Sequence, residues 1–156
     1  MALEIERKYL VDLEKLGTLQ TGNRIKQGYL STNKEAVVRV RVKNDKAYLT
    51  IKGSNVGVSR LEFEYEIPLD EANEMLEKLC QKPVIDKTRY LIEYENHTFE
   101  LDIFYGDNDG LVVAEVELSS EDETIKLPSW IKEEVTSDER YYNSYLMKNP
   151  YKNWKK

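Results

Sequence analysis

The sequence predicts a mainly β fold with a few helices (α+β), in which a closed antiparallel barrel keeps charged side chains inside and apolar side chains outside. Charged and apolar residues alternate along about seven or eight predicted strands, so each strand has one charged face and one apolar face. The charges also segregate by strand, because some strands carry acidic pairs and others basic residues. A barrel can hold such faces around a lumen and pack helices on its exterior.

An ordinary half-buried sheet, charged toward solvent, is the alternative for any single strand. Random solubilising charge would more usually mix the two signs and include Ser, Thr, Gln and Asn. Several strands repeat a face whose charges have one sign, which favours a closed barrel with a charged lumen over an ordinary half-buried sheet. Burying so many charges stabilises a fold poorly, so we expect the lumen to serve a function.

In the first half of the chain, turn signals separate the alternating segments. Asn44 and Asp45 predict a hairpin turn, and Gly28 predicts a bend or bulge. Asp12 to Gly17 reads as a capped helical turn. The strands predicted here cover residues 4–11, 23–31, 37–42, 48–52 and 60–67.

In the second half, one amphipathic helix precedes three more strands. Apolar residues at helical spacing predict that helix up to Cys80, with Asp70 as its cap. Trp130 and Ile131 are predicted on a short helix after Pro128. A last helix, capped by Ser137 or Asp138, is predicted to run to Lys148. The strands predicted here cover residues 87–94, 99–105 and 112–118.

Length and composition indicate one folded domain, residues 1–156, large enough for a sizeable core. The net charge of -6 argues against non-specific binding of nucleic acid, so any anion must be bound by a local basic cluster. Cys80 is the one cysteine, which excludes an internal disulfide and suits a reducing cytosol. No apolar run has membrane length, and we expect a cytoplasmic protein.

The ordered set of charged motifs resembles the CYTH domain, or triphosphate tunnel metalloenzyme, superfamily. Glu4-x-Glu6-x-Lys8 resembles that family's N-terminal signature. The later elements agree with the family in order: Arg39-x-Arg41, Lys52 ahead of a glycine, Glu62-x-Glu64, Lys87-x-Arg89, Asp102 and Glu115-x-Glu117. The resemblance implies a closed barrel of eight antiparallel strands, a tunnel lined by both charge signs, and divalent-metal-dependent chemistry on triphosphates.

Among the family's activities, the resemblance is greatest to bacterial tripolyphosphate-hydrolysing members. It implies hydrolysis of inorganic tripolyphosphate, with some activity on nucleoside triphosphates, by in-line attack of a metal-activated water. The sequence shows no aromatic clamp or adenine-reading pair, which favours tripolyphosphate over nucleotides. Alternatives within the family are a class IV adenylate cyclase and a thiamine triphosphatase. A non-catalytic binder of polyphosphate or nucleotides is a further alternative, but a pure anion binder has no use for acidic pairs.

The residues suggest three sets of roles. A triphosphate needs cations spaced along its length, and hard carboxylate oxygens suit Mg²⁺ or Mn²⁺. The sequence has no cluster of His or Cys residues, which argues against a zinc site. The single histidine, His97, is not expected to be catalytic. The predicted substrate-binding residues are Lys8, Arg39, Arg41, Lys52, Lys87 and Arg89. The predicted metal ligands are Glu4, Glu6, Glu62, Glu64, Asp102, Glu115 and Glu117. The predicted catalytic residues are Lys8 and, by the resemblance, Tyr29 and Lys87.

Overall fold

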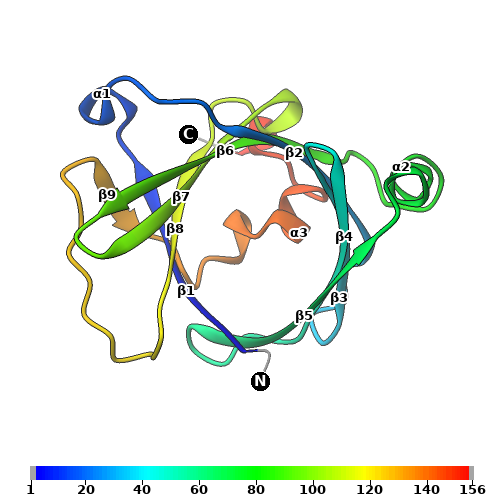
Figure 1. The fold of residues 1–156 in the computed structure, drawn as a ribbon, viewed down its shortest axis with the longest axis horizontal. Helices are drawn as coiled ribbons and strands as arrows, with labels where there is room; N and C mark the ends of the chain where they lie inside the picture. The colour runs from blue at the N-terminus through cyan, green and yellow to red at the C-terminus, as the bar shows by residue number, and fades with distance from the viewer. Residues whose placement is uncertain (1–2, 155–156) are drawn as a thin grey trace.

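The computed structural model describes residues 3–154 and shows a closed β-barrel viewed end-on in Figure 1. All neighbouring strands are antiparallel, in the order β5-β4-β3-β2-β6-β7-β8-β1-β9. The strands of the described range are β1 (Leu3–Val11), β2 (Asn23–Ser31), β3 (Val37–Lys43), β4 (Lys46–Lys52), β5 (Ser59–Ile67), β6 (Ile85–Tyr94), β7 (His97–Phe104), β8 (Val112–Glu117) and β9 (Ile131–Glu134).

Strand β1 closes the barrel. Its first residues pair with β5, with Leu3 opposite Leu61, and the residues that follow pair with β8, with Glu6 opposite Glu117. Its last residues also pair with the short β9, which adds a strand outside the eight-stranded ring. The predicted eight-stranded antiparallel barrel is therefore confirmed.

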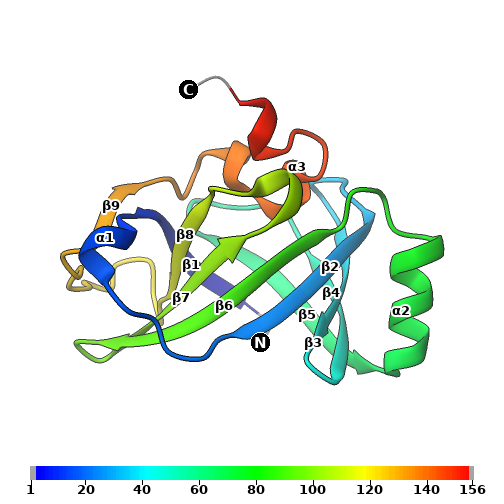
Figure 2. The same ribbon diagram turned by 90° about the horizontal axis from the view of Figure 1, so that it is seen from above.

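The barrel has its charged faces inside. Several charged residues of types that are normally exposed are buried here, namely Lys8, Lys52, Arg89 and Glu115. The apolar faces point outward, and α2 (Leu69–Lys78) packs on one of them through Ala72 and Leu76. Figure 2 shows α2 alongside the barrel wall.

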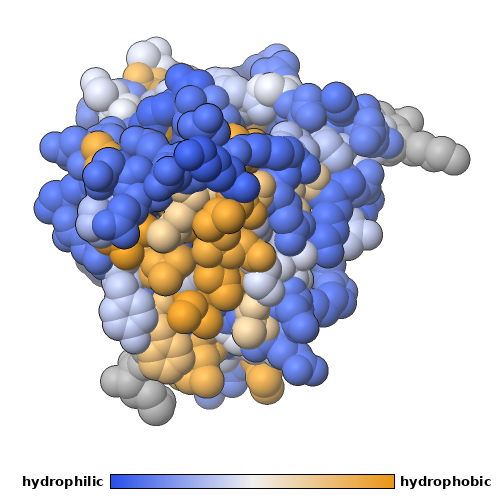
Figure 3. All heavy atoms as spheres, turned by 90° about the vertical axis from the view of Figure 1, so that its right-hand side faces the viewer, coloured by the Kyte–Doolittle hydropathy of each residue, from blue (hydrophilic) through white to orange (hydrophobic). Residues whose placement is uncertain are grey.

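One part of the apolar exterior is not covered. Leu61, Phe63 and Tyr65 on the outer face of β5 are exposed. Figure 3 shows apolar surface gathered on this side of the molecule.

The C-terminal segment, residues 139–154, lies across one end of the barrel (Figures 1 and 2). Leu146 and Met147 pack there in a cluster with Val37, Ile85 and Phe104, which stand at the ends of the inner strand faces. The apolar ends of otherwise charged faces thus explain why this segment is held at the barrel end. The segment contains η2 (Glu139–Tyr141), α3 (Asn143–Leu146) and η3 (Tyr151–Asn153), whereas α1 (Leu13–Leu16) and η1 (Gly106–Asn108) lie elsewhere.

Two predictions for the last third of the chain are wrong. Ile131 begins strand β9 and is not on a helix with Trp130, because the backbone there pairs with the end of β1. The predicted continuous helix up to Lys148 is broken at Tyr142, whose ψ of 134° is extended. Asp138 does cap the first turn by accepting from the backbone N–H of Arg140.

Two local predictions are also corrected. The residue before α2 is Pro68, and the Asp70 side chain accepts a hydrogen bond from Glu71 inside the helix instead of capping it. Gly28 lies in regular pairing opposite Val40, and the register shifts only after Tyr29. A Cβ at Gly28 would stand 2.8 Å from the Cβ of Cys80, so glycine is needed here for close packing of the segment that follows α2.

No helix in the described part of the chain is long and apolar enough to cross a membrane.

Candidate active site

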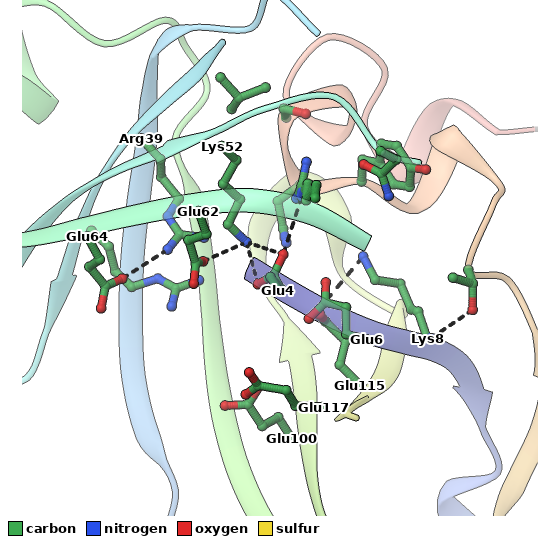
Figure 4. A pocket seen from close by; sticks show the side chains of 18 of the residues that line it. Glu4, Glu6, Lys8, Arg39, Lys52, Glu62, Glu64, Glu100, Glu115 and Glu117 are labelled. Atoms are coloured by element: carbon green, nitrogen blue, oxygen red, sulfur yellow. Dashed lines mark hydrogen bonds and ion pairs between the residues drawn. The ribbon is translucent and has the colours of Figure 1, made fainter. Parts of the chain in front are cut away.

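A cavity of about 210 Å³ occupies the lumen, and every strand of the eight-stranded ring contributes at least one side chain to its wall (Figure 4). We call it the tunnel cavity. It brings together most of the residues singled out from the sequence. These are Glu4, Glu6, Lys8, Tyr29, Arg39, Arg41, Lys52, Glu62, Glu64, Arg89, Glu115 and Glu117. Lys87 and Asp102 do not line it.

Strand β3 places two guanidinium groups in the tunnel cavity, because Arg39 and Arg41 are two residues apart on its inner face. Arg39 donates through Nη2 to Thr50 Oγ1 at 3.1 Å and lies 3.6 Å from Glu64. Its buried Nε has no hydrogen-bond partner in the described part of the chain. Arg41 donates to the Gln27 amide oxygen at 2.8 Å and forms no ion pair within residues 3–154. Burial and the nearby Arg39 and Arg89 lower the pKa of Arg41 to about 9, which leaves it charged at neutral pH.

Other cations in the cavity are compensated. Lys52 lies 3.0 Å from Glu4 and 3.3 Å from Glu62, and Arg60 lies 3.3 Å from Glu4. Burial raises the pKa of the Glu4 carboxyl, but Lys52 and Arg60 outweigh burial and bring it below its usual value. Arg60, which is not among the residues predicted from the sequence, is therefore part of this wall.

Strands β1 and β8 bring three carboxyl groups together. Burial raises the pKa of Glu6 well above its usual range, and the neighbouring Glu115 and Glu4 raise it further. Burial also acts on Glu115, but Lys8, a hydrogen bond with Glu6 and Arg89 hold its pKa well below the usual range. Clustered carboxyl groups that repel one another form a donor set that a hard divalent cation would stabilise.

Carboxylate oxygens are suitable ligands for a divalent cation, but their present positions do not form a metal site. In the part of the chain described, no group of three or more Asp, Glu, His or Cys side chains could hold a metal ion as it stands. Glutamate side chains can turn about several bonds, and Mg²⁺ needs only one or two carboxylates beside water and phosphate oxygens. The donor chemistry therefore fits Mg²⁺ or Mn²⁺, with the remaining ligands supplied by water and substrate.

Lys87 and Asp102 are fully buried beside the tunnel cavity, and both form an ion-pair group with Arg89, which lines the cavity. Lys87 Nζ is 2.8 Å from Asp102 Oδ2, and Arg89 donates from Nε and Nη2 to the same carboxylate at 2.8 and 2.9 Å. Burial raises the pKa of Asp102, but Arg89 and Lys87 outweigh it and lower the pKa to about 2. Burial lowers the pKa of Lys87 to about 7 despite Asp102. Both Asp102 oxygens are already engaged, so its assignment as a metal ligand stays a prediction from the sequence.

Tyr29 reaches the cavity wall from β2. Its hydroxyl oxygen accepts from Gln27 Nε2 at 3.2 Å, which leaves its own proton free for donation. Burial raises the pKa of Tyr29, so the hydroxyl keeps that proton at neutral pH.

Lys8 and the C-terminal segment meet at one end of the cavity. Lys8 Nζ donates to the backbone oxygen of Tyr141 at 3.1 Å and lies 4.0 Å from Glu115. Asn143 also lines the cavity, and its buried Oδ1 has no hydrogen-bond partner among the residues described. Asn143 was not predicted from the sequence, where only the apolar ends of the inner strand faces indicate that this segment reaches the lumen.

The sequence pattern of the CYTH domain matches residues 2–145. The chain belongs to the CYTH domain family. The resemblance found from the charged motifs is thereby confirmed.

Relatives of this CYTH protein match 92–99% of its length. It is 55% identical over 155 residues to a protein of Acetivibrio thermocellus named inorganic triphosphatase, with 99% of each chain covered. A protein of Nitrosomonas europaea with the same name is 38% identical, and the match covers 92% of this chain and 95% of the relative. The crystal structure of an inorganic triphosphatase superposes with a TM-score of 0.64 at 33% identity, covering 94% of this chain and 95% of that one.

Proposed function

We propose that the protein hydrolyses inorganic tripolyphosphate to pyrophosphate and orthophosphate in the tunnel cavity, with a divalent cation. One observation carries the proposal: within residues 3–154, the lumen holds a guanidinium, that of Arg41, without an ion-pair partner, beside a buried Arg39 Nε without a hydrogen-bond partner. Unsatisfied buried donors are costly, and an anion with several oxygens satisfies them. Relatives that match over nearly their full length carry the name inorganic triphosphatase.

Substrate binding follows from the basic side of the cavity. Arginine forks pair with two phosphate oxygens at once, so Arg39 and Arg41 are suited to neighbouring phosphoryl groups. Lys52 and Arg60 come from adjacent strands and extend the row of cations. Lys52 is now paired with Glu4 and Glu62, so binding a phosphate there requires exchanging these partners or sharing the ammonium.

The acidic side would hold the cation. Glu4, Glu6 and Glu115 are the first candidates, and Glu62, Glu64 and Glu117 are further carboxylates on the same cavity wall. A divalent cation would neutralise phosphoryl oxygens and lower the pKa of water. The carboxylates would then face the substrate without repelling it, which explains why both charge signs share one lumen.

The reaction itself is water attack in line with the leaving pyrophosphate. Charge passes to the leaving group in the transition state, and the fixed guanidinium groups of Arg39 and Arg41 stabilise it there. Tyr29 can donate its proton in a hydrogen bond to a phosphoryl oxygen. The assignments of Lys8 and Lys87 as catalytic residues stay predictions, since Lys8 is held by Tyr141 and Lys87 by Asp102.

The test is product analysis with purified protein. Tripolyphosphate, ATP and thiamine triphosphate are each incubated with Mg²⁺, with Mn²⁺ and with a chelator. We expect equal amounts of orthophosphate and pyrophosphate from tripolyphosphate, only with a metal, and a lower kcat/KM for ATP. Cyclic AMP from ATP would support a cyclase instead, and tight binding of tripolyphosphate without turnover would support a non-catalytic binder.

Several sequence predictions accompany this proposal. We keep a small-molecule triphosphate as substrate, with no nucleic acid or membrane partner, and a cytoplasmic location. The net charge of -6 supports the expectation that no nucleic acid binds, because most of the protein surface would repel a long polyanion.

A further inference from the structure

A second cavity, of about 500 Å³, adjoins the tunnel cavity. We call it the vestibule. Both cavities are lined by Val37, Asn55, Arg60, Tyr142 and Ser144, so these residues form the passage between them. The rest of the vestibule wall comes from the chain after β2, the loop after β4, and the C-terminal segment. A group attached to one end of a triphosphate in the tunnel could therefore extend into the vestibule.

The vestibule differs from the tunnel cavity in chemistry. Tyr145 lines it and is 41% exposed, and Tyr142 adds a second aromatic ring. Thr32, Ser144 and Asn55 add hydroxyl and amide groups to the wall of the same cavity. A site with aromatic walls and a few convergent polar groups is the usual kind of small-molecule pocket.

The charges of the vestibule limit what it can hold. Its one acidic residue, Glu139, lies 2.5 Å from Lys34 and compensates that lysine. Arg60 is engaged by Glu4. Lys148 is exposed and forms no ion pair with any residue in 3–154. One uncompensated lysine beside two tyrosines is a poor environment for a chain of further phosphates, each of which brings another negative charge.

We propose that the vestibule binds the nucleoside of a nucleoside triphosphate whose phosphates occupy the tunnel cavity. The proposal rests on the function proposed above and adds a binding site for a second class of substrate. The base stacks on Tyr145, and the ribose hydroxyls form hydrogen bonds with the hydroxyl and amide groups of the vestibule wall. Arg60, at the passage, lies beside the α-phosphate, which is the phosphate attached to the nucleoside. Stacking accepts every base because each has a π-face, so ATP and GTP should bind alike. The sequence suggested no aromatic clamp, because its tyrosines come together only when the C-terminal segment crosses the barrel end.

Tripolyphosphate has no nucleoside, so a change in the vestibule should affect ATP and leave tripolyphosphate unaffected. This difference between the two substrates provides the test. Tyr145→Ala is compared with Tyr145→Phe and with the control Tyr94→Ala, since Tyr94 is similarly exposed at 37% and lies at the end of β6 outside both cavities. For each variant, kcat and KM are measured for ATP, tripolyphosphate and a long-chain polyphosphate. Binding of an ATP analogue with a β,γ-imido bridge is measured by calorimetry.

We expect Tyr145→Ala to raise KM for ATP and Kd for the analogue about five- to tenfold, as for loss of one base–aromatic stack. The kcat for ATP should stay the same, because this binding is equal in ground and transition states. Hydrolysis of tripolyphosphate should stay within about twofold, and Tyr145→Phe and Tyr94→Ala should resemble the wild type.

Three results would overturn the inference. One is an equal loss on ATP and tripolyphosphate, which would give Tyr145 a structural role. Another is an unchanged affinity for the ATP analogue. The third is a loss on long-chain polyphosphate as large as that on ATP, which would assign the vestibule to phosphates. A wild type that binds the analogue through Tyr145 but does not hydrolyse tripolyphosphate would instead overturn the proposed function and leave the vestibule assignment standing.

Discussion

At the scale of single residues, the lumen combines one guanidinium, that of Arg41, which has no ion-pair partner among residues 3–154, with crowded carboxyl groups. Arg41 has a neutral amide as its hydrogen-bond partner, whereas Glu6 stands between Glu4 and Glu115. Neither arrangement stabilises a fold in the absence of ligand, because a buried charge without a partner is unfavourable. A triphosphate with a divalent cation would satisfy both at once.

Replacing Glu6 separates function from stability. Glu6→Gln keeps the shape of the side chain but removes a metal ligand, so tripolyphosphate hydrolysis at limiting metal should fall about 10- to 100-fold. The melting temperature should stay the same or rise, because one of three repelling carboxyl groups is gone. The measurement is a metal titration of the rate together with a thermal melt.

Glu133→Gln is the matched control, because Glu133 is exposed on β9 outside the tunnel cavity. It should change neither the rate nor the melting temperature. Full turnover of Glu6→Gln at limiting metal would remove Glu6 from the metal site.

Asp102 should matter for stability in a pH-dependent way. Asp102→Asn removes the buried carboxylate that Lys87 and Arg89 share. Arg89 keeps only its longer pairs, to Glu100 at 3.4 Å and Glu115 at 3.9 Å, so the free energy of unfolding near neutral pH should fall by about 3–5 kcal/mol. Because the pKa of Asp102 is lowered from 3.8 to about 2 in the folded protein, its contribution is complete above pH 4 and is lost as the pH falls toward 2. Urea denaturation of variant and wild type at several pH values in this range should show the difference narrowing.

Asp86→Asn is the control for this prediction, because Asp86 also pairs with an arginine, Arg24, but at an exposed site. Its loss of stability should be much smaller than that of Asp102→Asn. A difference between Asp102→Asn and wild type that stays constant down to about pH 2 would contradict the assigned ion-pair group.

At the scale of elements, the strands of the ring could be predicted because alternation is a local property. The hairpin at Asn44 and the strand of residues 23–31 were both found from their own sequences. Strand β9 was missed, since four residues with Ile131 as their one apolar side chain carry no alternating signal. Its conformation is set by pairing with the end of β1, which is distant in sequence.

The C-terminal segment shows the same limit more clearly. Tyr141, Tyr145 and Leu146 have helical spacing, but the backbone is extended at Tyr142 so that Leu146 can pack among the apolar ends of the inner strand faces. Those ends were visible in the sequence as Val113 beside Glu115 and as Phe104 beside Asp102. An apolar residue that continues a charged face indicates that something apolar enters the barrel there.

The packing around α2 gives a prediction for one glycine. A Cβ at Gly28 would meet Cys80 Cβ at 2.8 Å and Leu76 Cδ2 at 3.0 Å, so Gly28→Ala should force the end of α2 away from the barrel. The expected loss in the free energy of unfolding is about 1–3 kcal/mol, as for overpacking of a core. Urea denaturation measures it.

Gly53→Ala is the control, because its added Cβ would meet only Leu61 Cβ at an ordinary 3.7 Å. That change should leave stability within about 0.5 kcal/mol or raise it slightly. Equal effects of the two substitutions would mean that Gly28 is not required for this packing.

At the scale of the whole molecule, barrel closure turns separate charged faces into one site with two different ends. The C-terminal segment covers the end where Val37, Phe104 and Val113 stand. Glu64 and Glu117 lie further along their strands, away from that end, and both are exposed. The side chains that face the lumen could be predicted from the alternation along each strand. Which of them reach the cavity depends on their position along the barrel axis, and Lys87 and Asp102 lie beside the cavity in a buried pair.

In the proposed complex, triphosphate and divalent cation meet inside this barrel, between the guanidinium groups of β3 and the carboxyl groups of β1 and β8. The most direct measurement is a crystal structure with Mn²⁺ and tripolyphosphate at a pH where turnover is slow, using anomalous scattering to locate the metal. We expect Mn²⁺ within about 2.0–2.6 Å of carboxylate oxygens from Glu4, Glu6 or Glu115 and of phosphate oxygens. The chain of phosphates should lie against Arg39 and Arg41. Density for metal or triphosphate only outside the barrel, with an empty lumen, would contradict the proposed complex.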